Sequence, residues 1–310
     1  MEILDYAFMQ RALIAAALVG ITAPAIGTYL VQRRQAVMGD GLGHVAMTGV
    51  ALGFFFQASP VWMATLVAVL GAVGMELIRS RGKTSGDVAL AMLFYGGLAG
   101  GVLIINMAPG GSTANLVSAM FGSITTVASE DVTAMVVLAA FVIAVTIGLR
   151  RQLFAVCQDE EFARVTGLPV RALNLLIAVT AAVTVTVAMR IVGLLLVSAM
   201  MVIPVAAAQR MTRGFAATLG LAIAISVTVS LTGTAATYWI DAPSGATIVL
   251  LAIAVFMGMT ALSAPLARRR ARASAAGAAP EGQLCPRDGV QDDVKVQDGA
   301  GAQAARPGSA

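Results

Sequence analysis

The stretch Asp131 to Leu149, DVTAMVVLAAFVIAVTIGL, decides the fold class of this chain. Its only charged residue is the first one, and the remainder is apolar apart from two threonines and one glycine. A helix of about 20 such residues crosses the ~30 Å hydrocarbon core of a bilayer. The stretch therefore predicts a transmembrane helix.

Comparable apolar runs recur along most of the chain. The predicted spans are residues 8–31, 36–57, 60–78, 88–107, 131–149, 171–189, 191–208, 215–238 and 244–266. Composition agrees, because 58% of the residues are hydrophobic and only 12% are charged, whereas a soluble domain has about 25% charged residues. One cleaved signal peptide does not account for so many runs. We therefore predict an all-α integral membrane protein, a polytopic bundle of about eight to nine transmembrane helices within residues 1–267.

The basic residues are distributed unevenly between the predicted loops. With the N-terminus outside, most arginines and lysines face the cytoplasm, and only Arg11 and Arg190 lie near the other side. Cytoplasmic loops carry such an excess, so the N-terminus is predicted outside and the C-terminus inside. The same bias explains the positive net charge, and no nucleic acid partner is expected. Residues 268–310, rich in Ala, Gly, Pro, Gln and charge, are predicted to form a disordered cytoplasmic tail.

Two further patterns concern how the helices pack. Residues 115–127 are too short and too polar to span a membrane, and they predict either a re-entrant half-helix or a plain helix in an external loop. Glycine pairs four residues apart, among them Gly96 with Gly100 and Gly97 with Gly101, permit helices to approach closely.

Ionisable residues inside a span are costly and therefore indicate function. The second predicted span opens with MGDGLGH, residues 38–44, which places Asp40 and His44, the only histidine, one turn apart on one helix face. An imidazole and a carboxylate suit a divalent cation such as Zn or Mn better than a hard Ca or Mg ion. Two ligands are too few for a closed site, but a two-fold related copy would supply four. The alternative is a histidine hydrogen-bonded to Asp40 as a packing pair.

Other reactive residues do not form a catalytic site. Cys157 and Cys285 have no partner at metal-binding spacing. Residues 82–84, GKT, resemble the end of a phosphate-binding loop, but Leu77 stands where that loop needs a glycine. A membrane-embedded metalloenzyme would need more ligands than one histidine without an HExxH motif provides. The chain is therefore not expected to be an enzyme.

Three segments together resemble the zinc and manganese permeases of the ATP-binding-cassette class. Residues 39–46, GDGLGHVA, are similar to the family signature SDxxSHA, with glycines in place of serines. The resemblance implies that Asp40 and His44 line the translocation path and contact the metal. Residues 190–210, RIVGLLLVSAMMVIPVAAAQR, resemble the family's basic-xVGxLLV run, and Pro204 within it is predicted to kink the helix.

The third segment is the predicted cytoplasmic loop at residues 154–169. It resembles the family's coupling helix, which docks on the ATPase subunit, through Asp159, Glu161, Phe162, Ala163 and Gly167. The physical pattern fits a short helix, because acids at its start favour the helix dipole and a glycine ends it. Without the resemblance, the same segment also fits a solvated loop helix.

The resemblance implies the permease subunit of an ATP-driven importer for divalent metal ions, zinc or manganese, with the ion as cargo and no permanently bound cofactor. It also implies a separate ATPase subunit, an extracytoplasmic metal-binding protein and a second permease chain, expected to be identical, in a bacterial inner or plasma membrane. The main alternative is a secondary carrier that exchanges metal for protons, because an Asp and His pair can relay protons. Such a carrier would need neither the acidic coupling loop nor an ATPase.

Overall fold

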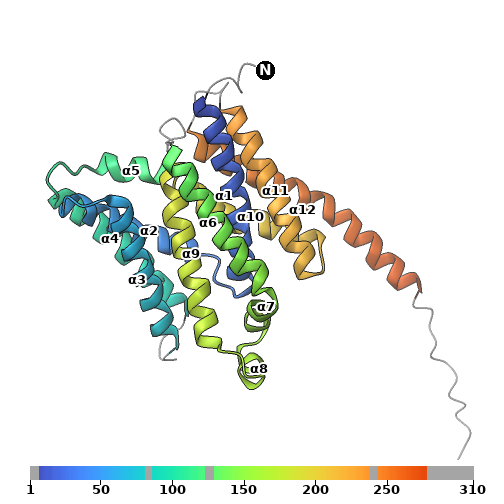
Figure 1. Ribbon diagram of the computed structural model, residues 1–310. Coiled ribbons are helices and arrows are strands. Elements are labelled where there is room, and N and C mark those ends of the chain that lie inside the picture. The colour runs from blue at the N-terminus through green and yellow to red at the C-terminus, as the bar shows by residue number, and fades with distance from the viewer. Residues whose placement is uncertain (1–6, 81–85, 123–128, 238–242, 278–310) are drawn as a thin grey trace, which may run out of the picture. The chain divides into compact units, whose positions relative to one another are not determined.

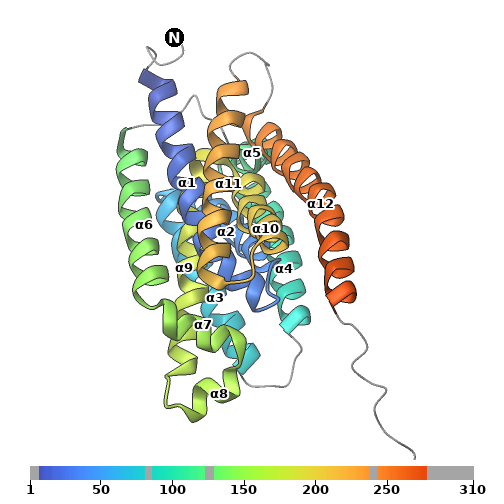
Figure 2. The ribbon, with the colours of Figure 1, turned by 90° about the vertical axis from the view of Figure 1, so that its right-hand side faces the viewer.

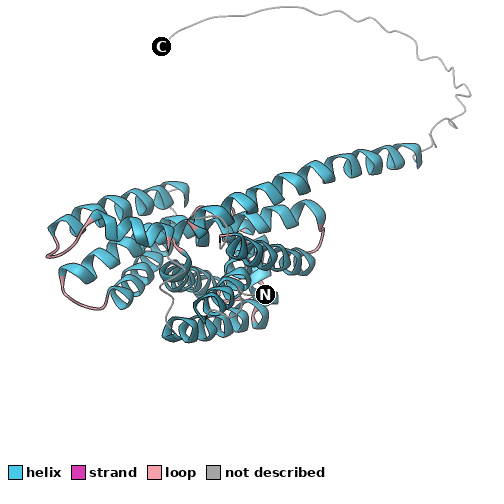
Figure 3. Ribbon diagram, turned by 90° about the horizontal axis from the view of Figure 1, so that it is seen from above, coloured by secondary structure: helices cyan, strands magenta, loops and turns pink. Residues whose placement is uncertain are grey.

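The computed structural model describes residues 7–80, 86–122, 129–237 and 243–277, and within these ranges helices are the only regular secondary structure (Figures 1 and 3). The prediction of an all-α protein is confirmed. The helices are α1 (Ala7–Gln32), α2 (Met38–Phe55), α3 (Pro60–Ser80), α4 (Gly86–Met107), α5 (Thr113–Phe121), α6 (Ser129–Gly148), α7 (Arg150–Gln158), α8 (Glu160–Val165), α9 (Val170–Val192), α10 (Leu194–Met211), α11 (Phe215–Ala236) and α12 (Ser244–Gly277).

Each predicted span corresponds to one long helix. In the described ranges, eight helices are long and apolar enough to cross a membrane, namely α1, α3, α4, α6, α9, α10, α11 and α12. The remaining long helix is α2, whose 18 residues include Asp40, His44 and five glycines, which lower its hydropathy. The prediction of about eight to nine spans is confirmed, and α2 is the helix on which the number depends.

Helix α2 is enclosed by its neighbours rather than exposed to lipid. It packs most extensively against α4 and α3 and also contacts α9 and α10 (Figure 2). Glycines permit these contacts, as predicted: a Cβ at Gly97 of α4 would lie 2.6 Å from the Val45 backbone nitrogen, and a Cβ at Gly49 would lie 2.5 Å from Ala64 Cα. Gly96, in contrast, faces open space. The helix that carries Asp40 and His44 therefore lies inside the bundle because glycines allow its neighbours to cover it.

The core around α1 holds a second group of helices together. Helix α1 packs against α11, α10 and α6, and Tyr29 is fully buried there. The Tyr29 hydroxyl donates a 2.6 Å hydrogen bond to the Thr146 carbonyl of α6. A Cβ at Gly27 would collide with the Met201 carbonyl of α10. The C-terminal half of α1 is thus fixed tightly to both α6 and α10.

The break predicted around Arg190 lies three residues later, at Gly193 between α9 and α10. Gly193 has φ +86°, a conformation that residues with a side chain rarely adopt. Gly122, at φ +69°, packs directly against it. This contact places the end of α5 beside the α9–α10 junction. Helix α5 covers the first part of the predicted half-helix and packs against α4 and α10, whereas residues 123–128 lie outside the described ranges.

The compact membrane unit ends at Pro265, close to the predicted end at residue 267. Helix α12 continues past this point to Gly277. Alanine and arginine dominate this extension, and both have high helix propensity. Residues 278–310 of the predicted tail lie outside the described ranges.

Candidate metal path and coupling segment

The Asp40 and His44 side chains lie on one face of α2, as their spacing predicts. The His44 Nε2 atom is 4.0 Å from Asp40 Oδ2, which is too long for a hydrogen bond. The packing-pair alternative is therefore not the geometry observed. His44 is buried, whereas the Asp40 side chain is 38% exposed, so the pair extends from the interior of the bundle to its surface.

The surroundings of His44 leave one ring nitrogen free for a ligand. The ring makes an edge contact with Phe94 of α4, with centroids 4.4 Å apart. Its Nδ1 atom is buried and has no hydrogen-bond partner, which is rare for a buried polar atom. Asp40, but not His44, lines a cavity of about 500 Å³, together with Val37, Leu90, Ala91, Phe94 and Tyr95. A cation entering this cavity would meet the Asp40 carboxylate between apolar walls.

Candidate metal ligands are few in the part of the chain that the structure describes. Among the described residues, no group of three or more His, Cys, Asp or Glu side chains could hold an ion. A zinc site normally takes four ligands, of which Asp40 and His44 could supply two.

The coupling segment forms helix α8, and α7 precedes it, with Asp159 between the two. Both short helices lie at the end of the bundle where α1 ends (Figure 1). The sequence had not predicted α7. Asp159 caps α8, since its Oδ1 accepts hydrogen bonds from the backbone N–H groups of Glu161 (2.9 Å) and Phe162 (3.0 Å).

Gly167 terminates α8 in the left-handed conformation, with φ +84°. Its N–H donates to the Arg164 carbonyl (3.1 Å), and the Leu168 N–H donates to the Ala163 carbonyl (3.0 Å). These two bonds define a Schellman motif. Asp159 and Gly167, both singled out from the sequence, therefore set the two ends of the helix.

The two faces of α8 differ in polarity and exposure. Ala163 is fully buried, whereas Glu161 is exposed. Phe162 and Val165 are 63% and 86% exposed, although both are large and apolar. Exposed apolar side chains on an otherwise charged segment are typical of a protein contact surface.

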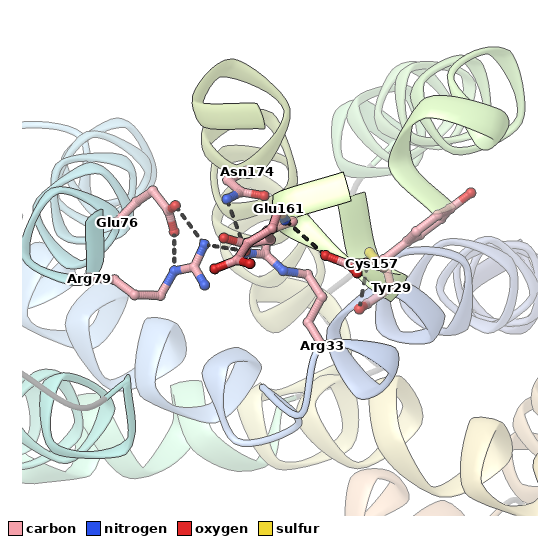
Figure 4. Close-up of polar contacts among 9 residues, drawn as sticks. Tyr29, Arg33, Glu76, Arg79, Cys157, Glu161 and Asn174 are labelled. Carbon is pink, nitrogen blue, oxygen red and sulfur yellow. Dashed lines mark hydrogen bonds and ion pairs between the residues drawn. The ribbon is translucent and has the colours of Figure 1, made fainter. Parts of the chain in front are cut away.

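Glu160, which the sequence did not single out, makes the most extensive polar contacts of this region. Its Oε1 accepts hydrogen bonds from Arg33 Nη2 (2.9 Å), Arg79 Nη2 (2.9 Å) and Asn174 Nδ2 (3.2 Å). Arg79 also pairs with Glu76 through two hydrogen bonds of 3.1 and 2.9 Å. We call these five residues the inner charge cluster. Figure 4 shows Glu76 and Arg79 of α3 close to Asn174 of α9 and to Arg33, which follows α1.

The charges of this cluster shift the pKa values of its members. Burial alone would raise the pKa of Glu160, but the hydrogen bond and charge of Arg79, together with the charge of Arg33, lower it below its usual value. Burial and the nearby Arg79 lower the pKa of Arg33. Burial raises the pKa of the adjacent Cys157 thiol to about 12, so this cysteine stays protonated and unreactive.

Pro204 lies inside α10 and is buried. Because proline has no N–H, the Met200 carbonyl one turn earlier lacks its usual helical partner. A kink at this position stays a prediction.

The comparison with known proteins agrees with this architecture. Residues 5–263 match the ABC 3 transport family, and the chain belongs to that family. Membership confirms the predicted kind of protein, a multi-pass permease of an ATP-binding-cassette transporter rather than its ATPase.

Individual relatives cover nearly the whole membrane unit. The chain is 31% identical to a probable metal transport system membrane protein of Treponema pallidum, over 84% of this chain and 97% of the relative. It is 30% identical to the manganese transport system membrane protein MntC of Halalkalibacterium halodurans, over 82% and 87%. The solved structure of PsaBC from Streptococcus pneumoniae in complex with Fab matches with a TM-score of 0.74 and 28% identity, over 83% of this chain and 94% of that one.

Proposed function

We propose that the chain is the membrane-spanning subunit of an ATP-driven importer for a divalent metal ion, manganese or zinc, and that Asp40 and His44 contact the ion in transit. The observation that carries this proposal is the unpaired, buried His44 Nδ1 in a helix whose neighbouring Asp40 opens into a cavity. The names of the relatives, a probable metal and a manganese transport protein, support the same class of cargo.

The proposal includes three partners and an orientation. A separate ATPase subunit would dock on the exposed Phe162 and Val165 of α8, a metal-binding protein would deliver the ion from outside, and a second identical chain would complete the metal site. Arg33, Arg79 and Arg164 all lie at the α8 end of the bundle. Because cytoplasmic ends carry the excess of basic residues, this end would face the cytoplasm of a bacterium and the N-terminus would lie outside.

Uptake assays with variants of the metal pair test the cargo site. Asp40→Ala and His44→Ala should reduce manganese or zinc uptake to background at unchanged membrane levels, because each removes a ligand without interrupting α2. Thr65→Val is the control, since Thr65 lies in α3 and its hydroxyl donates within that helix, to the Val61 carbonyl (2.9 Å). Wild-type uptake in either ligand variant would disprove the assignment.

Recovery of the ATPase in detergent tests the docking surface. Phe162→Ala should weaken the complex by ~2 kcal/mol or more, the effect of removing an aromatic anchor at an interface. Phe56→Ala is the control, because Phe56 is similarly exposed, at 64%, but lies after the C-terminal end of α2 rather than in α8. Uptake by the wild-type chain without any ATPase would instead favour the secondary carrier.

A further inference from the structure

The inner charge cluster connects α8 to three long helices at once. Glu160 is the first residue of α8, and its partners come from three other elements: Arg33 directly follows α1, Arg79 lies in the last turn of α3, and Asn174 lies near the start of α9. The bonds meet at a single carboxylate oxygen, so a displacement of α8 acts on all three helices simultaneously.

The charges of the cluster balance only while Glu160 is present. Two guanidinium groups, Arg33 and Arg79, face two carboxylates, Glu76 and Glu160. The Arg33 and Glu76 side chains are only 4% and 9% exposed, so water screens these charges weakly. Removing one carboxylate would leave a buried cation without its partner, which is strongly unfavourable. This cluster differs in that respect from an exposed surface salt bridge.

Helix α8 depends on such contacts for its orientation. It has six residues, and an isolated helix of that length is not stable in water. The capping hydrogen bonds determine where α8 begins and ends, but they lie within the segment and do not orient α8 against the bundle. The hydrogen bonds of the Glu160 carboxylate with Arg33, Arg79 and Asn174 do orient it.

The inner charge cluster is also connected to α2, the helix of the proposed metal site. Helix α1 ends at Gln32, Arg33 follows, and α2 begins at Met38, so Arg33 and Asp40 are separated by a short connection. Arg79 belongs to α3, which packs extensively along α2. A displacement of Glu160 can therefore reach α2, which carries Asp40 and His44, through the connection between α1 and α2 and through the packing of α3 on α2.

We propose that Glu160 is a positioning residue that couples the ATPase to the metal path: it fastens α8 to the inner ends of α1, α3 and α9, so that α8 moves with these helices. This inference rests on the proposed function, in which α8 is the docking site of the ATPase. Glu160 does not contact the ion. Its task is to transmit motion between elements that pack as rigid units.

The test compares variants in the reconstituted complex of this chain with its ATPase. Glu160→Ala and Arg33→Gln are expected to retain ATPase recovery and ATP hydrolysis, because Phe162 and Val165 are unchanged. The amount of manganese transported per ATP hydrolysed should fall roughly 3- to 30-fold, the range associated with disrupting a coupling network. Arg34→Gln is the matched control, since Arg34 is the adjacent arginine, is exposed, and should behave as wild type.

Two further variants guard against misfolding as the explanation. Glu160→Gln keeps the shape and one acceptor oxygen but removes the charge, and it should show a smaller fall in the same ratio. The double variant Glu160→Ala with Arg33→Gln should be no worse than the more severe single variant, because residues in one network are not additive.

The possible outcomes separate the two proposals. An unchanged ratio of metal to ATP in folded Glu160→Ala and Glu160→Gln would overturn the role of Glu160 while leaving the ATP-driven importer intact. Loss of ATPase recovery in folded Glu160→Gln would also overturn it, because Glu160 would then serve docking. Uptake by the wild-type complex that does not depend on ATP would overturn the proposed function itself.

Discussion

Three consecutive acids, Asp159, Glu160 and Glu161, occupy three different environments although their chemistry is nearly the same. Asp159 folds back on the backbone as a cap, Glu160 points to the arginines of α1 and α3, and Glu161 is exposed. Successive residues of a helix differ by about 100° in direction, so neighbours face different partners. The direction of each side chain, rather than its charge, determines its task.

The lowered pKa of Glu160 predicts a pH dependence. The folded pKa lies below the unfolded reference of about 4.3, so the charged form is favoured by folding. The stability that ionised Glu160 contributes to the folded state is therefore fully present above the unfolded pKa and is lost as pH falls through the folded pKa. The charged groups facing it are Arg33, Arg79 and Glu76. In thermal unfolding of the detergent-solubilised protein, wild type should have a higher unfolding midpoint than Glu160→Gln. This difference in midpoint should be constant near neutrality and shrink below about pH 4. A difference that persists at low pH would contradict this explanation.

The conformation of Gly167 predicts a second effect at a single position. Nothing lies within 4 Å of a Cβ placed there, so Gly167→Val would add backbone strain without a steric clash. At φ +84° this strain should cost about 1–3 kcal/mol and shift or fray the end of α8. ATPase recovery should fall. Gly220→Val is the control, because Gly220 also faces open space but lies inside α11 without a positive φ. Equal recovery for both variants would show that the end of α8 is unimportant for docking.

At the scale of helices, the contact between α2 and α4 predicts opposite results for two adjacent glycines. Gly97→Ala would place a methyl group 2.6–2.7 Å from the backbone of Val45 and His44, where only a shift of the helices can relieve it. Such overpacking costs about 1–3 kcal/mol. Because Phe94 of α4 contacts the His44 ring, metal uptake should fall as well.

The neighbouring substitution provides the control for this contact. Gly96→Ala adds its methyl group to open space on the same helix and should leave both the unfolding midpoint and the uptake unchanged or slightly raise the midpoint. If Gly97→Ala were as stable and as active as Gly96→Ala, the close approach of α4 to α2 would not support the metal path.

The sequence predicted the elements that depend on local properties. Long apolar runs located all nine long helices of the described ranges, since the length needed to cross a bilayer is fixed. Helix α7 was missed because residues 150–158, RRQLFAVCQ, are too polar and too short for that criterion. The exact break at Gly193 was also missed. Gly193 packs against Gly122, which is far away in the sequence. The local sequence marks the break only by Gly193 itself, and the chain has many other glycines.

The same division applies to the candidate site. The spacing of Asp40 and His44 predicted that they share a helix face, the helix dipole predicted acids at the start of α8, and Gly167 was predicted to end it. All of these rules act within a few residues. Glu160 could not be distinguished from Asp159 and Glu161, because Arg33 and Arg79 lie 127 and 81 residues away in the chain. Only the folded bundle brings these charges together.

On the scale of the membrane unit, two groups of polar residues concern the proposed function. The metal pair lies in α2, and the inner charge cluster lies beside α8. The short connection between α1 and α2 joins the two groups, and α3 packs along both α2 and α9. This arrangement suits a transporter that receives energy at one end and moves an ion inside, because the two tasks use different residues but share helices.

The number of ligands predicts how many chains hold one ion. Asp40 and His44 provide two side chains, the described part of one chain offers no third, and a closed zinc site needs about four. Two copies related by a two-fold axis would supply them, and the half-exposed Asp40 can reach such an axis only if α2 and α4 face the partner. Purified in detergent, the protein should therefore bind about one Zn²⁺ or Mn²⁺ per two chains in equilibrium dialysis. Dimers that carry His44→Ala in one of two differently tagged chains should lose tight binding although the other chain is intact. One ion per chain, or wild-type affinity in the mixed dimer, would show that each chain forms a complete site alone.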